Sequence, residues 1–174
     1  MSFAVVVLAF VTLQRLGELV IAQRHTAALI ARGAYEVASE HYPLIVAVHT
    51  AWLVSLWWFA GLPGLVPGLG WIALFCLLQL GRVWVLVTLG SRWTTRIIVL
   101  PGAALVTSGP FRFLSHPNYV VVVGEIAVLP VAFGLYSLAI VFTLLNAAVL
   151  VIRIRAETAA LRTAAKEPTH VTHN

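Results

Sequence analysis

The sequence predicts an all-α integral membrane protein with about five transmembrane helices, the last two forming a short hairpin, and with a C-terminal amphipathic helix. Composition is the first reason. Of the 174 residues, 61% are hydrophobic and only 10% are charged, and the mean hydropathy is +0.98, whereas about 25% of the residues in soluble domains are charged. Spacing is the second reason, because the apolar residues form runs of roughly 20, which is the length of a helix that crosses a hydrocarbon core about 30 Å thick.

Three hydrophobic runs in the first half of the chain predict the first three helices. The first covers residues 3–22, and it has neither a basic segment before it nor a small-residue cleavage site after it, so we expect it to be retained. The second covers residues 43–61 and the third residues 69–90. Between these two, residues 62–69 contain Gly and Pro but no charge, which predicts a tight external turn.

The second half of the chain combines a polar loop with a hairpin. Residues 91–117 carry Arg, Gly and Pro, which indicates a long ordered loop with a short strand at RIIVL. A hydrophobic hairpin is expected over residues 118–152 with a break at 130–136, and its arms of about 15 to 17 residues cross at most a thinned hydrocarbon core. We therefore expect one membrane-embedded domain over residues 1–165 and a disordered tail over residues 166–174.

The basic residues favour one orientation in the membrane. With five passes, the basic ends of the runs fall on the same side, which the positive-inside rule makes cytoplasmic. The N-terminus is therefore predicted outside the inner cell membrane, with the C-terminus in the cytoplasm. Despite the net charge of +5, these residues form no continuous basic stripe, so no nucleic-acid partner is expected. From about residue 150 to 164, charges mix with Ala and Leu, a pattern typical of an amphipathic surface helix.

Four ionisable residues lie inside hydrophobic runs, where burial costs about 2.5 to 3.5 kcal/mol each near the bilayer centre. Arg15 and Glu18 are three residues apart on one helical face and can pair with each other. Arg82 and Glu125 must instead meet each other or serve a ligand.

Other polar residues in the runs have simpler interpretations. Gln79 and Asn146 are expected to bridge helices through hydrogen bonds. His49 is expected to be satisfied by a neighbouring carbonyl, and the single Cys76 to pack in its helix. The six His residues form no HEXXH or other metal-ligand pattern, so no metal is expected.

Several ordered sequence blocks resemble a known family. The blocks are QRLGELVIAQR, RWTTRIIVLPGA, SGPFRFLSHPNY, EIAVLP, FTLLNA and RIRAETAAL. Together they resemble the isoprenylcysteine carboxyl methyltransferase family, and most closely its small bacterial branch, which is linked to O-methylation of lipidic polyketides such as alkylpyrones. The resemblance extends from Gln14 to Leu161.

The resemblance implies a methyltransferase that uses S-adenosylmethionine at the cytoplasmic membrane face. The cofactor carries a carboxylate, an ammonium, a sulfonium and an adenine, so its site needs cations, a carboxylate and an apolar slot. The implied cofactor-binding residues are Arg112, His116, Pro117, Tyr119, Asn146 and Glu157. The implied catalytic residues are Arg153, Glu157 and Glu125. Arg153 and Glu157 share a helical face at a spacing of four, although such arginines could instead anchor the helix to lipid headgroups.

The sequence does not distinguish between several acceptors or between several classes of protein. The expected acceptor is a lipophilic small molecule from the bilayer, either an alkylpyrone-like polyketide or a prenylcysteine-like carboxylate, and membrane lipids surround the protein. The chain departs from the family pattern at Ser115 and Thr158, where charged residues are common. The alternatives are a phospholipid or fatty-acid methyltransferase, and a non-catalytic transporter or scaffold component in which Arg82 and Glu125 line a polar path. The oligomeric state is open.

Overall fold

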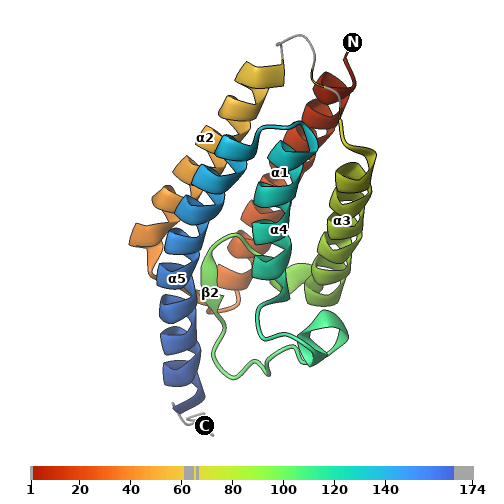
Figure 1. Cartoon of the computed structure of the whole chain (residues 1–174). Helices are drawn as coiled ribbons and strands as arrows, with labels where there is room; N and C mark the ends of the chain where they lie inside the picture. The colour runs from red at the N-terminus through yellow and green to blue at the C-terminus, as the bar shows by residue number, and fades with distance from the viewer. Residues whose placement is uncertain (1, 61–64, 66, 167–174) are drawn as a thin grey trace, which may run out of the picture.

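The computed structural model describes residues 2–60, 65 and 67–166, with side chains up to residue 160. Half of the expected turn at 62–69 and, apart from Lys166, the expected tail lie outside these residues. The described chain forms a helical bundle with its elements in the following order (Figure 1): α1 (Phe3–Ile30), β1 (Tyr35–Val37), η1 (Ser39–His41), α2 (Tyr42–Ala60), α3 (Leu69–Leu89), η2 (Gly90–Arg92), β2 (Ile97–Val99), η3 (Gly109–Arg112), α4 (Pro117–Ala132) and α5 (Tyr136–Lys166).

Four of these helices are long and apolar enough to cross a membrane, namely α1, α2, α3 and α5. The fifth helix, α4, is apolar but has only 16 residues. The helical membrane fold expected from the sequence is therefore confirmed, with four helices of spanning length in the described part of the chain rather than five.

The last two helices differ from the expected short hairpin. Its first arm, α4, has 16 residues, but α5 has 31 and continues without a break to Lys166. The prediction that the second arm ends near residue 152 is wrong, because the following segment contains neither Gly nor Pro and is rich in the good helix formers Ala, Leu and Arg. The segment expected to form a separate amphipathic helix is the continuation of α5.

The polar connections gather at one end of the bundle, which we call the loop end (Figure 1). It comprises residues 31–41 and 90–116. The short strand expected at RIIVL is confirmed as β2, and it pairs antiparallel with β1, which the sequence did not indicate. Arg96 Nη1 reaches Glu36 Oε2 across this pair at 2.8 Å, and Ile97 and Val99 pack with Ala160 of α5.

The core lies where α1, α2, α4 and α5 pack together, and α3 adds Phe75 to it. One contact in this core explains how a proline is tolerated. Pro130 lies inside α4 and has no N–H to donate to the carbonyl of Ile126, one turn earlier. The buried indole Nε1 of Trp52 donates to this carbonyl at 3.2 Å. In an apolar surrounding such a replacement donor matters, because no water is present to satisfy the carbonyl.

His49 and Cys76 are two isolated residues within the hydrophobic runs. His49 Nδ1 lies 2.8 Å from the Ile45 carbonyl, which confirms that a neighbouring carbonyl satisfies this ring. Cys76, in contrast, is exposed on α3 rather than packed in the interior.

Candidate functional site

A polar cluster lies at the loop end where the first turn of α4 meets α5. α4 begins at Pro117, whose fixed φ and missing N–H suit the first helical position. This start places His116 and Tyr119 beside α5, and Arg153 and Glu157 lie one turn apart on the facing side of α5. We call His116, Tyr119, Arg153 and Glu157 the loop-end cluster.

Hydrogen bonds join the members of the loop-end cluster. Arg153 Nε donates to the Tyr119 hydroxyl oxygen at 2.9 Å, and the Tyr119 hydroxyl donates to Glu157 Oε2. Arg153 Nη2 donates to the Thr95 carbonyl at 2.7 Å. The His116 ring stacks on Tyr119 with centroids 5.3 Å apart, and its Nδ1 lies 3.9 Å from Glu157 Oε2. The cluster thus presents a cation, an anion and an aromatic face together.

The phenol of Tyr119 is a hydrogen-bond donor at neutral pH. Burial, followed by the negative charge of Glu157, raises the pKa of Tyr119 above its usual value of about 10. The proton therefore stays on the phenol and points to Glu157, while Arg153 donates to the phenol oxygen. Glu157 and His116 each keep about a quarter of their side chains exposed, so the cluster remains accessible from the loop end.

Residues of the loops support the cluster in a way that the sequence did not reveal. The Tyr42 hydroxyl lies 3.2 Å from Thr95 Oγ1, and the Arg96 guanidinium lies over the Tyr42 ring, 4.4 Å from its centroid. Because Arg153 binds a backbone carbonyl at Thr95, no side-chain identity in the sequence could have indicated this contact. β1 and β2 fix the segment that carries it.

The loop before α4 lies directly on the end of α3. Gly109 has φ +56, and a Cβ at this position would lie 2.5 Å from Thr88 Oγ1. Only glycine both adopts a positive φ at no steric cost and lacks the Cβ that would clash here. This close approach holds the start of η3 against the last turn of α3. Ser115 is exposed and Thr158 is half-buried, so the loop-end cluster forms without the charged groups that the family commonly has there.

The structure separates three of the expected site residues from the cluster. Arg112 is exposed, with its guanidinium 5.8 Å from the centroid of the Phe113 ring. Asn146 is buried on α5, and its Nδ2 has no hydrogen-bond partner among the described residues, so the expected bridge between helices is not formed by that atom. Glu125 lies six residues beyond Tyr119 in α4, about 9 Å along the helix axis.

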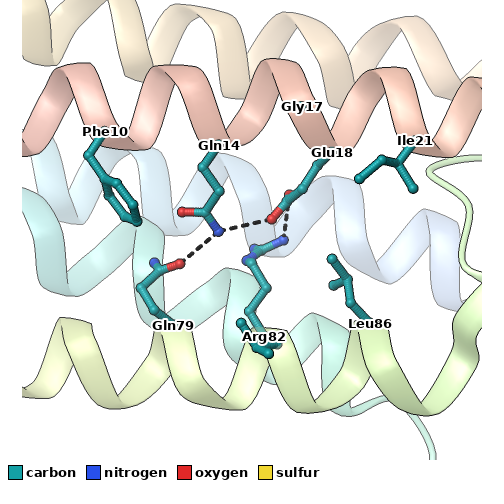
Figure 2. Close-up of a pocket in the computed structure, with 9 residues that line it drawn as sticks. Phe10, Gln14, Gly17, Glu18, Ile21, Gln79, Arg82 and Leu86 are labelled. Carbon is teal, nitrogen blue, oxygen red and sulfur yellow. Dashed lines mark hydrogen bonds and ion pairs between the residues drawn. The ribbon is translucent and has the colours of Figure 1, made fainter.

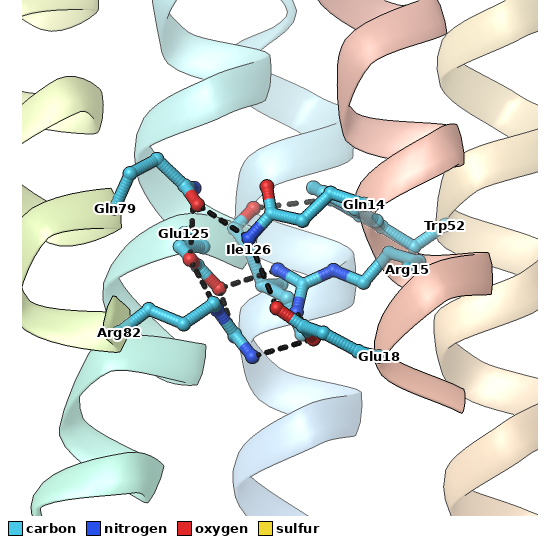
Figure 3. Close-up of polar contacts among 8 residues, drawn as sticks. All are labelled: Gln14, Arg15, Glu18, Trp52, Gln79, Arg82, Glu125 and Ile126. Carbon is cyan, nitrogen blue, oxygen red and sulfur yellow. Dashed lines mark hydrogen bonds and ion pairs between the residues drawn. The ribbon is translucent and has the colours of Figure 1, made fainter. Parts of the chain in front are cut away.

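Glu125 belongs instead to a second set of polar side chains inside the bundle, which we call the charge network (Figure 3). Its members come from α1, α3 and α4 and are Gln14, Arg15, Glu18, Gln79, Arg82 and Glu125. The expected pairs of Arg15 with Glu18 and of Arg82 with Glu125 are both confirmed. The sequence did not show that the two pairs join into one network.

Each charge in the network has more than one partner. Arg82 donates to both oxygens of Glu125, with Nε at 2.8 Å from Oε1, and its Nη1 lies 3.0 Å from Glu18 Oε2. Arg15 likewise bridges Glu18 at 2.9 Å and Glu125 at 2.6 Å. Gln79 Nε2 adds a bond to Glu125 Oε1 at 2.8 Å. Two cations and two anions leave the network neutral, which is the condition for burying charges in an apolar region.

Metal-ligand groups and unpaired polar atoms indicate what kind of cofactor could bind. The described residues contain no group of three or more His, Cys, Asp or Glu side chains that could hold a metal ion. Two buried polar atoms lack partners among the described residues, namely Asn118 Oδ1, next to Tyr119 in sequence, and Trp93 Nε1, two residues before Thr95. An unpaired buried acceptor and donor are costly, and an organic ligand with both donors and acceptors would satisfy them.

A bundle of apolar helices of membrane-spanning length, with a charged and aromatic cluster at one end, is typical of an integral membrane protein. Comparison with known proteins gives its family. The model of the isoprenylcysteine carboxyl methyltransferase (ICMT) family matches residues 71–163, which include the loop-end cluster. The chain therefore belongs to the ICMT family, a membership that supports a membrane methyltransferase.

A bacterial relative supports the same assignment over more of the chain. Uncharacterized protein YpbQ of Bacillus subtilis (strain 168) is 35% identical over 158 residues, covering 89% of this chain and 94% of that protein. No solved structure matches the chain. The resemblance found in the sequence blocks is thereby confirmed at the level of the family.

Proposed function

We propose that this protein transfers a methyl group from S-adenosylmethionine to an oxygen atom of a lipophilic acceptor at the cytoplasmic face of the inner cell membrane. The observation that carries the proposal is the loop-end cluster. It combines Arg153, Glu157 and an aromatic stack within the region that matches a methyltransferase family.

The chemistry of the cluster fits the cofactor. Arg153 uses its Nε and Nη2 in the protein, so its Nη1 can donate to the carboxylate of the amino-acid moiety. Glu157 can accept from the ammonium group, and the unpaired Asn118 Oδ1 and Trp93 Nε1 can serve a purine. His116 and Pro117 provide the aromatic and apolar edge. These roles account for Arg153, Glu157, His116 and Pro117 among the site residues that the resemblance implies.

Three residues have proposed roles without a contact to the cluster. We propose that exposed Arg112, four residues before His116, turns toward the cofactor when it binds. Asn146 retains an unpaired Nδ2 for the same ligand. Glu125 acts as a positioning residue, because its bonds to Arg15 and Arg82 fix α4 and thereby the placement of Tyr119.

The proposed reaction requires little acid or base chemistry from the protein. S-adenosylmethionine would supply the methyl group as an electrophile on a sulfonium sulfur. An acceptor that is a carboxylate or an acidic enol is already ionised at neutral pH, so the cluster needs no strong base. Arg153 can hold such an anionic oxygen through the N–H groups that the protein leaves free. Alignment and desolvation of the reactants then supply most of the acceleration.

The proposed orientation follows from where the arginines lie. The loop end contains Arg32, Arg92, Arg96 and Arg112, and the described end of α5 adds Arg153 and Arg155. Arginine-rich connections stay in the cytoplasm. This supports an N-terminus outside the cell membrane and a site that a soluble cofactor can reach.

The transporter alternative depended on Arg82 and Glu125 lining a polar path. In the structure these two side chains bind each other, and they are 3% and 1% exposed. A pair that is closed in this way offers no open polar path at that point of the bundle. This observation favours the enzyme.

The acceptor class can be tested by transfer of a labelled methyl group. Membranes that contain the protein are incubated with methyl-labelled S-adenosylmethionine and, in separate reactions, a long-chain alkylpyrone, a prenylcysteine analogue and a phospholipid. We expect label in an O-methyl product of the alkylpyrone, because its enol is acidic and its chain is apolar. Membranes from cells without the protein are the control. Label on a phospholipid headgroup nitrogen, or on none of the three, would contradict the proposal.

A further inference from the structure

A groove runs between α1 and α3 on the lipid-facing side of the bundle. It consists of two adjoining hollows of about 320 Å³ and 410 Å³, which share Phe10 and Gln79 in their linings. Figure 2 shows the first hollow, with α1 on one side and α3 on the other. Volumes of this size are in the range of small-molecule sites. The lining extends along α3 from Ile72 to Leu86, about 21 Å of helix.

The surface of this groove is apolar even where it passes the charge network. Glu18 and Arg82 contribute to the lining, but their charged groups turn toward each other and toward Glu125. What faces the hollows is carbon, including the rings of Phe3 and Phe10. A hydrocarbon chain can therefore lie in the groove without removing water from any charge.

A glycine in the middle of α1 keeps the groove open. Gly17 lines the first hollow, and a Cβ at this position would meet nothing within 4 Å. Gly81 and Gly124 allow the close approach of α3 and α4, but no packing contact of this kind explains Gly17. Glycine is a poor helix former, and at this position of a 28-residue helix it leaves the first hollow without a side chain.

The groove also leads toward the proposed methyl-transfer site. Its inner end is at Leu86, one turn before α3 ends. On the α1 side, His25 follows Ile21 by one turn, and its Nδ1 lies 2.9 Å from the Trp93 carbonyl. Two residues further along, the Thr95 carbonyl accepts from Arg153 of the loop-end cluster. A chain lying in the groove would thus end with its head group toward the segment that holds Arg153.

We infer that the groove between α1 and α3 holds the single hydrocarbon chain of the methyl acceptor, with its polar head toward the loop end. The inference rests on the proposed function, because it identifies the ligand as the acceptor. It also makes Gly17 a specificity-determining position. A larger residue there would narrow the first hollow between its junction with the second, at Phe10 and Gln79, and its inner end at Leu86, and would exclude long chains.

Photochemical labelling tests the location of the chain. The probe is a 4-hydroxy-2-pyrone with a pentadecyl chain that ends in a diazirine, added to the purified full-length protein and irradiated. We expect label on residues 3–10 of α1 and 72–79 of α3. Gly17→Leu should reduce this labelling at least about tenfold, because it excludes several methylenes from an apolar surface. Gly70→Leu is the matched control and should leave labelling unchanged, since Gly70 also has open space around a Cβ but does not line the groove.

Other outcomes of the same experiment overturn the inference. Label mainly on α2 or α5, or equal labelling of Gly17→Leu and the unaltered protein, would exclude the groove. Competition by excess phospholipid that equals competition by the unlabelled pentadecyl pyrone would show a general lipid site instead of an acceptor site. If Gly17→Leu does not fold, the labelled positions in the unaltered protein and in Gly17→Ala decide whether the chain lies in the groove.

The test separates this inference from the proposed function. S-adenosylhomocysteine is added to the same preparations, and the thermal midpoint is measured. We expect an equal rise for the unaltered protein, Gly17→Leu and Gly70→Leu. If none of them responds, the methyltransferase proposal fails, while the labelling pattern still reports whether a chain occupies the groove.

Discussion

Replacing Arg82 with methionine is expected to lower the free energy of unfolding by about 3 to 5 kcal/mol, because it removes one partner of a buried ion network. Arg82 bonds to both Glu125 and Glu18. In Arg82→Met, these two carboxylates share only Arg15, so one negative charge remains uncompensated in an apolar region. The measurement is the thermal midpoint in detergent together with the yield of folded protein.

Two further variants make the Arg82 prediction specific. Arg82→Met combined with Glu125→Gln restores neutrality and should recover part of the loss, as a double-mutant cycle would show. Arg155→Met is the control, since Arg155 is exposed and surface substitutions usually change stability by less than about 0.5 kcal/mol. Equal midpoints for Arg82→Met and Arg155→Met would mean that the charge network does not stabilise the bundle.

Replacing Glu157 with glutamine is expected to lower kcat/KM for methyl transfer about 100-fold while the protein still folds and inserts. Glutamine keeps the shape of the side chain but removes the negative charge of the carboxylate. This carboxylate accepts a hydrogen bond from the Tyr119 hydroxyl and lies near His116. Charged hydrogen bonds contribute about 1.5 to 3 kcal/mol, which corresponds to factors of roughly 10 to 150. The measurement is the initial rate with labelled S-adenosylmethionine over a range of cofactor concentrations.

The controls for Glu157→Gln address charge and fold separately. Glu40→Gln removes a carboxylate whose side chain is 69% exposed and whose nearest ionic partner is its neighbour His41, so it should leave the rate unchanged. His116→Ala should reduce the rate as Glu157→Gln does, because it removes the ring stacked on Tyr119. Full activity of both His116→Ala and Glu157→Gln would exclude the loop-end cluster as the site.

Much of this structure could be predicted because membrane burial limits what a sequence can do. Long apolar runs must be helices, since only a helix satisfies its own backbone in lipid. Charges within them must find partners, which is why the pairs of Arg15 with Glu18 and Arg82 with Glu125 could be proposed from the sequence. The spacing of four between Arg153 and Glu157 likewise placed both on one face of α5, where they meet Tyr119.

The remaining features depend on contacts between distant segments. To predict that the two ion pairs join, one must know that α1, α3 and α4 meet at one level of the bundle. The support of Arg153 by the Thr95 carbonyl requires the β1–β2 pair, and no sequence pattern indicated β1. The extension of α5 to Lys166 goes beyond the expected hairpin, because the charges after residue 152 favour a surface helix on pattern alone. The family resemblance implies a catalytic role for Glu125, whereas packing puts it in the charge network.

The central claim is that the loop-end cluster binds S-adenosylmethionine, and titration of the purified protein with the product S-adenosylhomocysteine tests it most directly. Ligand that binds only the folded protein stabilises it by about 2.7 kcal/mol at 100 times Kd. We predict that the thermal midpoint rises with ligand concentration in the unaltered protein, and that Glu157→Gln requires at least about tenfold more ligand for the same rise. A midpoint that does not move at saturating S-adenosylhomocysteine would contradict the claim.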